Sequence, residues 1–115
     1  MKPMDLPKQL GQIAKKLRRA GIQATLRPDQ IPVPGAWVMV SEIDAQFLSG
    51  QVIEGEYQVT LVARDLGSTS ALAQLCEMLE RVGEVLPPPT KCDITNLQLP
   101  GQGAVLPALT LTYDF

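Results

Sequence analysis

The sequence from Tyr57 to Pro89 is YQVTLVARDLGSTSALAQLCEMLERVGEVLPPP. Its first eight residues place an apolar side chain at every second position, which predicts a β-strand with one buried face. After a break at residues 65–67, apolar residues recur at helical spacing over about 17 residues, and three prolines end the predicted helix. The apolar stripe of this helix, which we expect in the core, comprises Leu72, Leu75, Cys76, Leu79, Val82 and Leu86. A buried strand and a helix that covers it therefore form the centre of the expected fold.

Weaker patterns supply the other elements. An amphipathic helix is expected over Leu6 to Ala20, and Gly21 suits its end because glycine tolerates a positive φ. Residues 41–56 combine Gly50 and Gly55 with acidic and apolar side chains, and we expect a long excursion between two strands there. Alternating patterns predict further strands at residues 22–27, 36–40, 92–99 and 106–113.

The expected order of elements is α-β-β-β-α-β-β within a single domain, residues 1–115. Most of the strands follow one another through short connections, which favours antiparallel pairing. The two helices then cover one face of a sheet of four or five strands. The sequence thus predicts an α+β fold with a mainly antiparallel sheet.

Composition narrows the function classes. The chain has 45% hydrophobic and 19% charged residues, which are the values of a globular domain. It has no histidine and only two cysteines, so neither a serine–histidine nucleophile, a zinc site nor a disulfide framework is expected. We therefore expect no catalytic residue, metal, cofactor or enzyme activity. No signal peptide or bilayer-spanning segment is expected, so we predict a soluble, intracellular protein.

The charges are sorted along the chain. Residues 1–27 contain seven of the ten basic side chains and one acidic side chain, whereas residues 28–115 contain three basic and eleven acidic ones. The two parts therefore carry charges of +6 and −8, which give the net charge of −2. Such polarity favours contact with DNA through the basic part, or head-to-tail association with a second copy.

The densest basic cluster lies on the first helix and comprises Lys15, Lys16, Arg18 and Arg19. These side chains could bind the phosphates of a nucleic acid. However, the region has no aromatic residue on which bases could stack, and a strand follows the helix where a helix-turn-helix protein has its recognition helix. A solvated face, a protein interface and a nucleic-acid surface all stay open. Acidic counterparts are Glu77, Glu80 and Glu84 on the second helix, and Glu42, Asp44, Glu54 and Glu56 in the excursion.

With this order of elements, the chain resembles the tail terminator proteins of long-tailed bacteriophages. The resemblance rests on YQVTLVARD (residues 57–65), the following Gly67-Ser68, the helix to Leu86 and the closing strand LTLTY (residues 109–113). Chain length and element order match over nearly the whole chain.

The resemblance implies a structural virion protein with no chemistry of its own. Members of that family close into a ring of six subunits on the last ring of the tail tube, stop tube polymerisation and present the other face to the head–tail connector. The implied partners are further copies of the chain, the tail tube protein and the connector protein, with DNA passing through the ring. The implied location is the tail of the virion, and the host cytoplasm during assembly.

Two alternatives accompany this expectation. A tail tube protein or a head–tail joining protein of related fold is the close alternative. A small nucleic-acid-binding domain that uses the basic first helix is the alternative from another class.

A ring requires two unlike surfaces on each subunit, and a charge-sorted chain offers them. We expect Lys15, Lys16, Arg18 and Arg19 to face an acidic surface of the adjacent subunit, either Glu77, Glu80 and Glu84 or the acids of residues 41–56. We expect the excursion to be mobile in the free subunit and to bury its apolar side chains against the tube or a neighbour on assembly. Those side chains are Phe47, Leu48, Val52 and Ile53.

Overall fold

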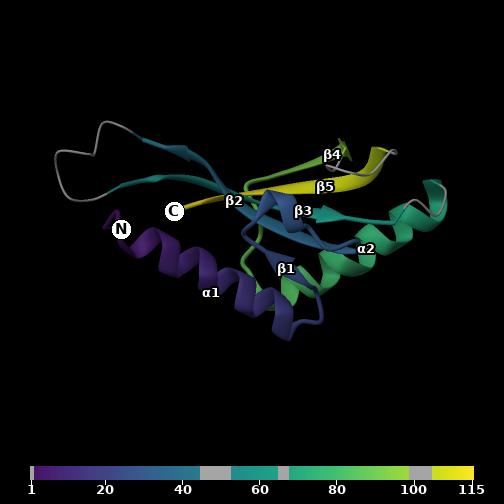
Figure 1. Cartoon of the computed structure of the whole chain (residues 1–115), viewed down its shortest axis with the longest axis horizontal. Coiled ribbons are helices and arrows are strands. Elements are labelled where there is room, and N and C mark those ends of the chain that lie inside the picture. The colour runs from purple at the N-terminus through teal and green to yellow at the C-terminus, as the bar shows by residue number, and fades with distance from the viewer. Residues whose placement is uncertain (1, 45–52, 65–67, 99–104) are drawn as a thin grey trace.

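The computed structural model describes residues 2–44, 53–64, 68–98 and 105–115, in which five strands form one sheet of order β1-β2-β3-β5-β4 (Figure 1). The strands are β1 (Ala24–Thr25), β2 (Gly35–Ile43), β3 (Gly55–Val62), β4 (Lys91–Gln98) and β5 (Val105–Asp114). β1 and β2 pair in parallel, and the other neighbouring strands pair antiparallel. The predicted α+β class and order of elements are confirmed.

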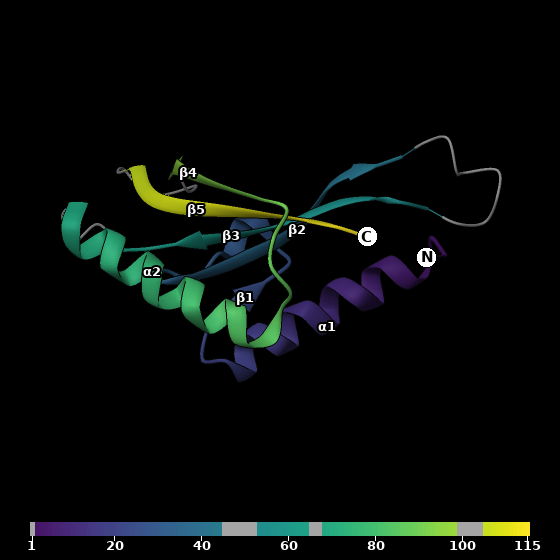
Figure 2. The same ribbon diagram turned by 180° about the vertical axis from the view of Figure 1, so that it is seen from behind.

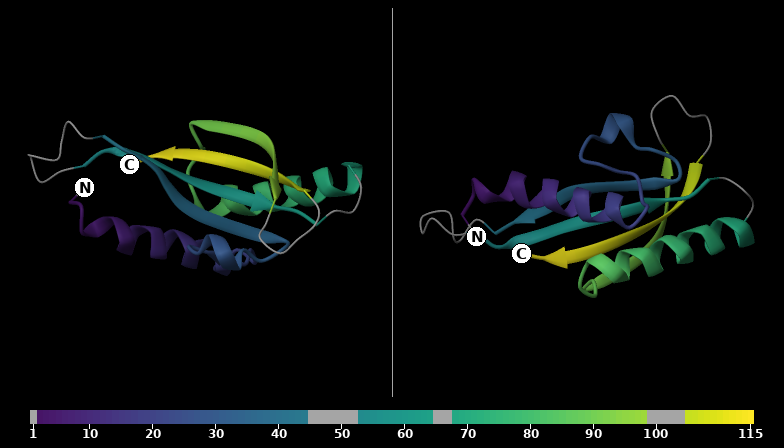
Figure 3. Two further views of the ribbon diagram at one scale, coloured as in Figure 1. Left: turned by 45° about the horizontal axis from the view of Figure 1, so that its top comes forward. Right: turned by 90° about the horizontal axis from the view of Figure 1, so that it is seen from below.

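The helices α1 (Asp5–Arg19) and α2 (Ser68–Val85) lie on the same face of the sheet, as predicted (Figures 1, 2 and 3). α1 contacts β1 and β2, whereas α2 contacts β3 and β5. Tyr57, Val59 and Leu61 of β3 point into the core between the sheet and the helices. The helices contribute Ile13, Ala14, Leu17, Ala71, Leu75, Met78 and Val82 to the same core.

A smaller apolar cluster lies on the other face of the sheet. Val62 and Leu106 are buried there, and Ile31, Val33 and Leu97 pack against them. Ile31 and Val33 belong to the connection between β1 and β2, which also contains the 3-10 helix η1 (Pro28–Gln30). This connection therefore covers part of the face that the helices leave open.

Gly21 ends α1 as the sequence predicts. Its φ is +88°, in the left-handed region that favours glycine. The N–H of Gly21 donates to the carbonyl oxygen of Arg18, and the N–H of Ile22 donates to that of Leu17, each at 3.0 Å. This is the Schellman pattern, which satisfies two of the last carbonyl groups of the helix and turns Ile22 into the core.

The buried side of α2 differs from the prediction. Leu72 is 50% exposed and Cys76 is exposed, whereas Ala71 and Met78 are buried. The helix has more apolar positions than the sheet covers, so two overlapping stripes fit the sequence pattern. The position of α2 over β3 and β5 selects the stripe that begins at Ala71.

The described ends of the expected excursion, residues 41–44 and 53–56, continue the neighbouring strands. β2 continues to Ile43 and β3 begins at Gly55, so both strands reach into the expected excursion. A register shift between Val40 and Glu42 interrupts the alternation, which hides this continuation in the sequence. Gly55 permits the pairing, because a Cβ there would collide with the carbonyl oxygen of Glu42.

β4 is an edge strand with little cover. Among the described residues, only β5 pairs with it. Most of its side chains are exposed, and Ile94 reaches 75% exposure. Its outer edge therefore presents backbone N–H and C=O groups that no described strand pairs.

We expect Gly21→Ala to destabilise the protein by about 1–2 kcal/mol, because the left-handed conformation strains a residue that has a Cβ. The added Cβ would also lie 3.0 Å from Arg81 Nη1. Gly11→Ala within α1 is the matched control: its Cβ meets nothing within 4 Å, and we expect it to stabilise by about 0.5–1 kcal/mol. Urea unfolding measures both changes, and effects of the same sign would contradict this account.

We expect the protein to lose stability in strong alkali through Tyr113, whose ring stacks on that of Tyr57 at a centroid distance of 5.0 Å. Burial, and then the nearby Tyr57 and Cys92, raise the pKa of Tyr113 to about 12. The folded state thus favours the neutral phenol, and this stabilisation is complete below pH 10.0 and lost as the pH rises through about 12. An alkaline titration should show the absorbance of tyrosinate rising together with unfolding. If Tyr57 and Tyr113 both ionised near pH 10.0 while the protein stayed folded, this expectation would be contradicted.

Candidate functional site

The basic residues of α1 face away from the sheet. Lys8, Lys15 and Arg19 are spaced by seven and four residues, so they form a stripe on the side of α1 opposite its buried residues. Lys16 is exposed beside this stripe. No ion pair among the described residues involves any of these four side chains. Lys15, Lys16 and Arg19, three of the predicted interface residues, are therefore available to a partner.

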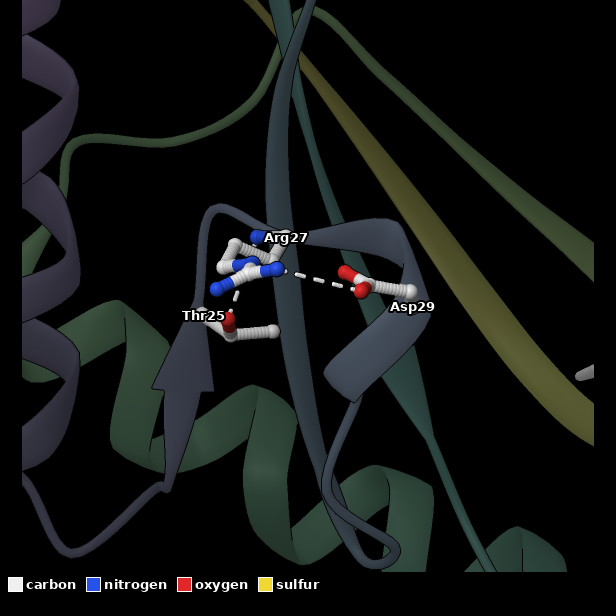
Figure 4. A network of polar contacts seen from close by, with 3 residues as sticks. All are labelled: Thr25, Arg27 and Asp29. Carbon is white, nitrogen blue, oxygen red and sulfur yellow. Dashed lines mark hydrogen bonds and ion pairs between the residues drawn. The ribbon is translucent and has the colours of Figure 1, made fainter.

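Two other arginines bind within the subunit. Arg18 Nε and Nη2 donate to the carbonyl oxygen of Ala24 at 3.2 and 2.9 Å, which ties the end of α1 to β1. Arg27 Nη2 donates to Asp29 Oδ2 at 3.2 Å, and the backbone N–H of Arg27 donates to Thr25 Oγ1 at 3.1 Å (Figure 4). Arg18 thus has a structural role in addition to its predicted one, and Asp29 offsets the charge of Arg27.

The predicted acidic surface on α2 is divided. Glu77 Oε1 accepts from Arg81 Nη2 at 2.8 Å, an exposed i,i+4 pair whose contribution is roughly a few tenths of a kcal/mol. Glu80 and Glu84 are exposed and have no ion-pair partner in the described part of the chain. Arg81 Nη1 also donates to the carbonyl oxygen of Gly21 at 3.4 Å, which places this part of α2 next to the end of α1.

A row of carboxylates crosses three strands where the β2–β3 hairpin leaves the sheet. Glu42 lies opposite Glu56, and Glu56 lies opposite Asp114. No ion pair among the described residues involves this carboxylate row, and like charges directly opposite each other destabilise a sheet. Residues 41–44 and 53–56, which we call the acidic arm, extend beyond the rest of the sheet (left in Figure 1).

The apolar residues predicted to contact the tube or a neighbour divide into two groups. Phe47, Leu48 and Val52 lie outside the described residues. Ile53 is 2% exposed, so the expectation that it is presented to a partner from the free subunit is wrong. The backbone N–H of Asp44 donates to the carbonyl oxygen of Glu54 at 2.7 Å, so pairing continues beyond the ends of β2 and β3.

A cleft of about 450 Å³ lies between α2, the end of α1 and the end of β3. Gln74 Oε1 accepts the backbone N–H of Arg64 at 2.8 Å, and Arg81 is held by Glu77 and Gly21 as described above. The cleft is lined by the guanidinium groups of Arg64 and Arg81 and by one carboxylate, that of Glu77, so we call it the basic cleft. Its lining residues are Gly21, Ile22, Gln23, Val33, Pro34, Arg64, Gln74, Glu77, Met78 and Arg81.

The basic cleft has no counterpart in the sequence analysis. Its residues come from four separate segments, and neither Arg64 nor Arg81 stands in a basic cluster along the chain. The Tyr57 to Pro89 pattern places both arginines on predicted elements, but the position of the end of α1 relative to α2 depends on tertiary packing. Only the folded chain brings these groups together.

Other chemical groups were assessed in the described residues. Cys76 and Cys92 are free and exposed; burial, followed by the charge of Asp93, raises the pKa of Cys92, which disfavours its thiolate. Among the described residues, no three cysteine or carboxylate side chains are grouped so as to hold a metal ion. No described helix has the length and apolar character needed to cross a membrane.

We expect Glu56→Gln to stabilise the free subunit by roughly a few tenths of a kcal/mol, because it removes the central charge of the carboxylate row. The gain should shrink at high salt, which screens exposed charges. Glu77→Gln is the control, since it makes the same change of charge but removes an ion pair with Arg81. Urea unfolding at low and high salt measures both variants, and equal gains from the two would contradict repulsion within the row.

Comparison of the chain with models of known protein families, with curated proteins and with solved structures found no match.

Proposed function

We propose that this chain is a structural virion protein that forms a ring of six subunits at the end of a phage tail tube, ends tube polymerisation and provides the face to which the head attaches. The observation that carries the proposal is the separation of charge within the subunit. Lys15, Lys16 and Arg19 lie in the C-terminal half of α1, whereas the acidic arm lies level with the N-terminal end of that helix (Figure 1). Lys15 lies ten residues after the first residue of α1, a rise of about 15 Å at 1.5 Å per residue, so these three side chains are separated from the acidic arm.

Unlike surfaces at separate places suit a heterologous interface, in which one patch meets a different patch on the neighbour. Such contacts close into a ring when the rotation between neighbours permits it, and otherwise form an open filament. The segment at residues 57–65 and the order of elements, which resemble those of tail terminator proteins, support the closed form. A tube or joining protein of related fold is distinguished from a terminator by whether assembly stops at one ring.

The purified chain should therefore form a closed particle of six times the 12.5 kDa subunit mass. Size-exclusion chromatography with light scattering measures the mass, and negative-stain electron microscopy distinguishes rings from tubes. Long tubes would favour the tube protein. A subunit that stays monomeric at every concentration would refute the ring.

A nucleic-acid-binding domain is the second candidate, and the exposed Lys15, Lys16 and Arg19 favour it. Changing these three residues to Glu, with Arg18 left to hold Ala24, should keep the fold and weaken assembly. Exposed ion pairs contribute only about 0–1 kcal/mol each, so the change should act mainly on orientation and association rate. If the variant assembles normally but no longer binds DNA, the second candidate is established. If neither assembly nor DNA binding changes, the three side chains are only a solvated face of the helix.

A further inference from the structure

The basic cleft and the carboxylate row lie at opposite ends of β3. The strand begins at Gly55, next to Glu56, and ends at Val62, two residues before Arg64. An extended chain from Glu56 to Arg64 spans about 26 Å at 3.3 Å per residue. The cleft and the row of one subunit therefore cannot meet, and no ion pair among the described residues involves either Arg64 or Glu56.

The cleft holds the guanidinium group of Arg81 and the backbone of Arg64 in defined places. Gln74 fixes the backbone of Arg64, while Glu77 and the carbonyl oxygen of Gly21 orient Arg81. Each guanidinium has five N–H donors, and these contacts use only two of those of Arg81. The Arg81 side chain is 43% exposed, so its charge is partly withdrawn from solvent. Donors of this kind suit carboxylates, which accept two parallel N–H groups from one arginine.

We propose that the basic cleft of one subunit binds the carboxylate row of a second copy of this chain. This inference rests on the proposed function and deepens it, because it names the two surfaces that meet. The row brings three like charges together, no ion pair with a cation is found for it among the described residues, and the cleft supplies two guanidinium groups. Charge complementarity therefore favours this pairing, and each copy offers both halves of the contact.

The position of the cleft also gives the basic helix a part in this contact. The cleft begins at Gly21, two residues after Arg19, so the C-terminal end of the basic helix lies close to the cleft. A neighbouring carboxylate row would approach through this positive field before it reaches Arg64 and Arg81. The helix then guides the approach, and the cleft determines the register.

The acids of α2 are the competing partner, and they are less suited. Glu77 already pairs with Arg81 inside the cleft. Glu80 and Glu84 are exposed on the same helix that forms one wall of the cleft. A contact between two copies of that wall would be symmetric and would end at a dimer, whereas the cleft and row form an unlike pair that can continue around a ring.

The test is a charge exchange between Arg64 and Glu56, measured by sedimentation velocity as the concentration at which subunits associate. We expect Arg64→Glu to weaken association by at least about tenfold, as for loss of one partner of a desolvated charge pair. Arg64→Lys should weaken it less, because a lysine keeps the charge but loses bidentate binding. The double variant Arg64→Glu with Glu56→Arg should recover association, since each contact then contains the exchanged pair.

Arg27→Glu is the matched control, because it makes the same change of residue and charge outside both the cleft and the carboxylate row, and should leave association near that of the unmodified chain. Circular dichroism and urea unfolding verify that each variant is folded. Normal association of folded Arg64→Glu in a chain that still forms rings would overturn the pairing and leave the proposed function standing. Failure of the double variant to recover would exclude the row as the partner. A monomeric unmodified chain would refute the proposed function itself.

Discussion

Burial of one face of β3 is the constraint on which the rest of the structure depends. Tyr57, Val59 and Leu61 form the centre of the core, with β2 and β5 on either side. α2 packs over β3 and β5, and α1 packs over β1 and β2, so each helix has its place because the sheet presents this apolar face. The ends of the same strand lead to the acidic arm and to the basic cleft. The strand that determines the core thus also determines how far apart the charged surfaces lie.

The charged surfaces differ in how they could be used. The stripe on α1 is convex and open, and ion pairs made by such surfaces are weak and easily screened by salt. The cleft is concave, and neighbouring groups hold its Arg81 side chain in place, so it would provide selectivity that a flat basic face lacks. In the proposed contact, the helix would supply long-range attraction and the cleft would determine how the two copies are aligned.

The spacing of apolar residues predicted the helices and strands because this spacing depends on the local backbone conformation. The alternation after Tyr57 and the glycine at the end of α1 each have a cause within a few residues, and both predictions are confirmed. The side of α2 that is buried was predicted incorrectly at Leu72 and Cys76, because two stripes compete and packing chooses between them. The bulge after Val40 concealed the continuation of β2. The basic cleft could not be predicted, since its walls meet only when α1 and α2 pack side by side.

The outer edge of β4, which no described strand pairs, affects the solubility of the chain. Proteins usually protect such an edge with charges, prolines or bulges, yet the segment from Ile94 to Gln98 contains no charged residue and no proline, and its register with β5 is unbroken. Lys91 and Asp93 protect only the beginning of the strand. Strand addition at this edge has no fixed stopping number, so it leads to aggregates of indefinite size. If the chain forms the proposed ring, assembly should therefore be favoured where the free chain stays dilute and ring closure is faster than random edge pairing.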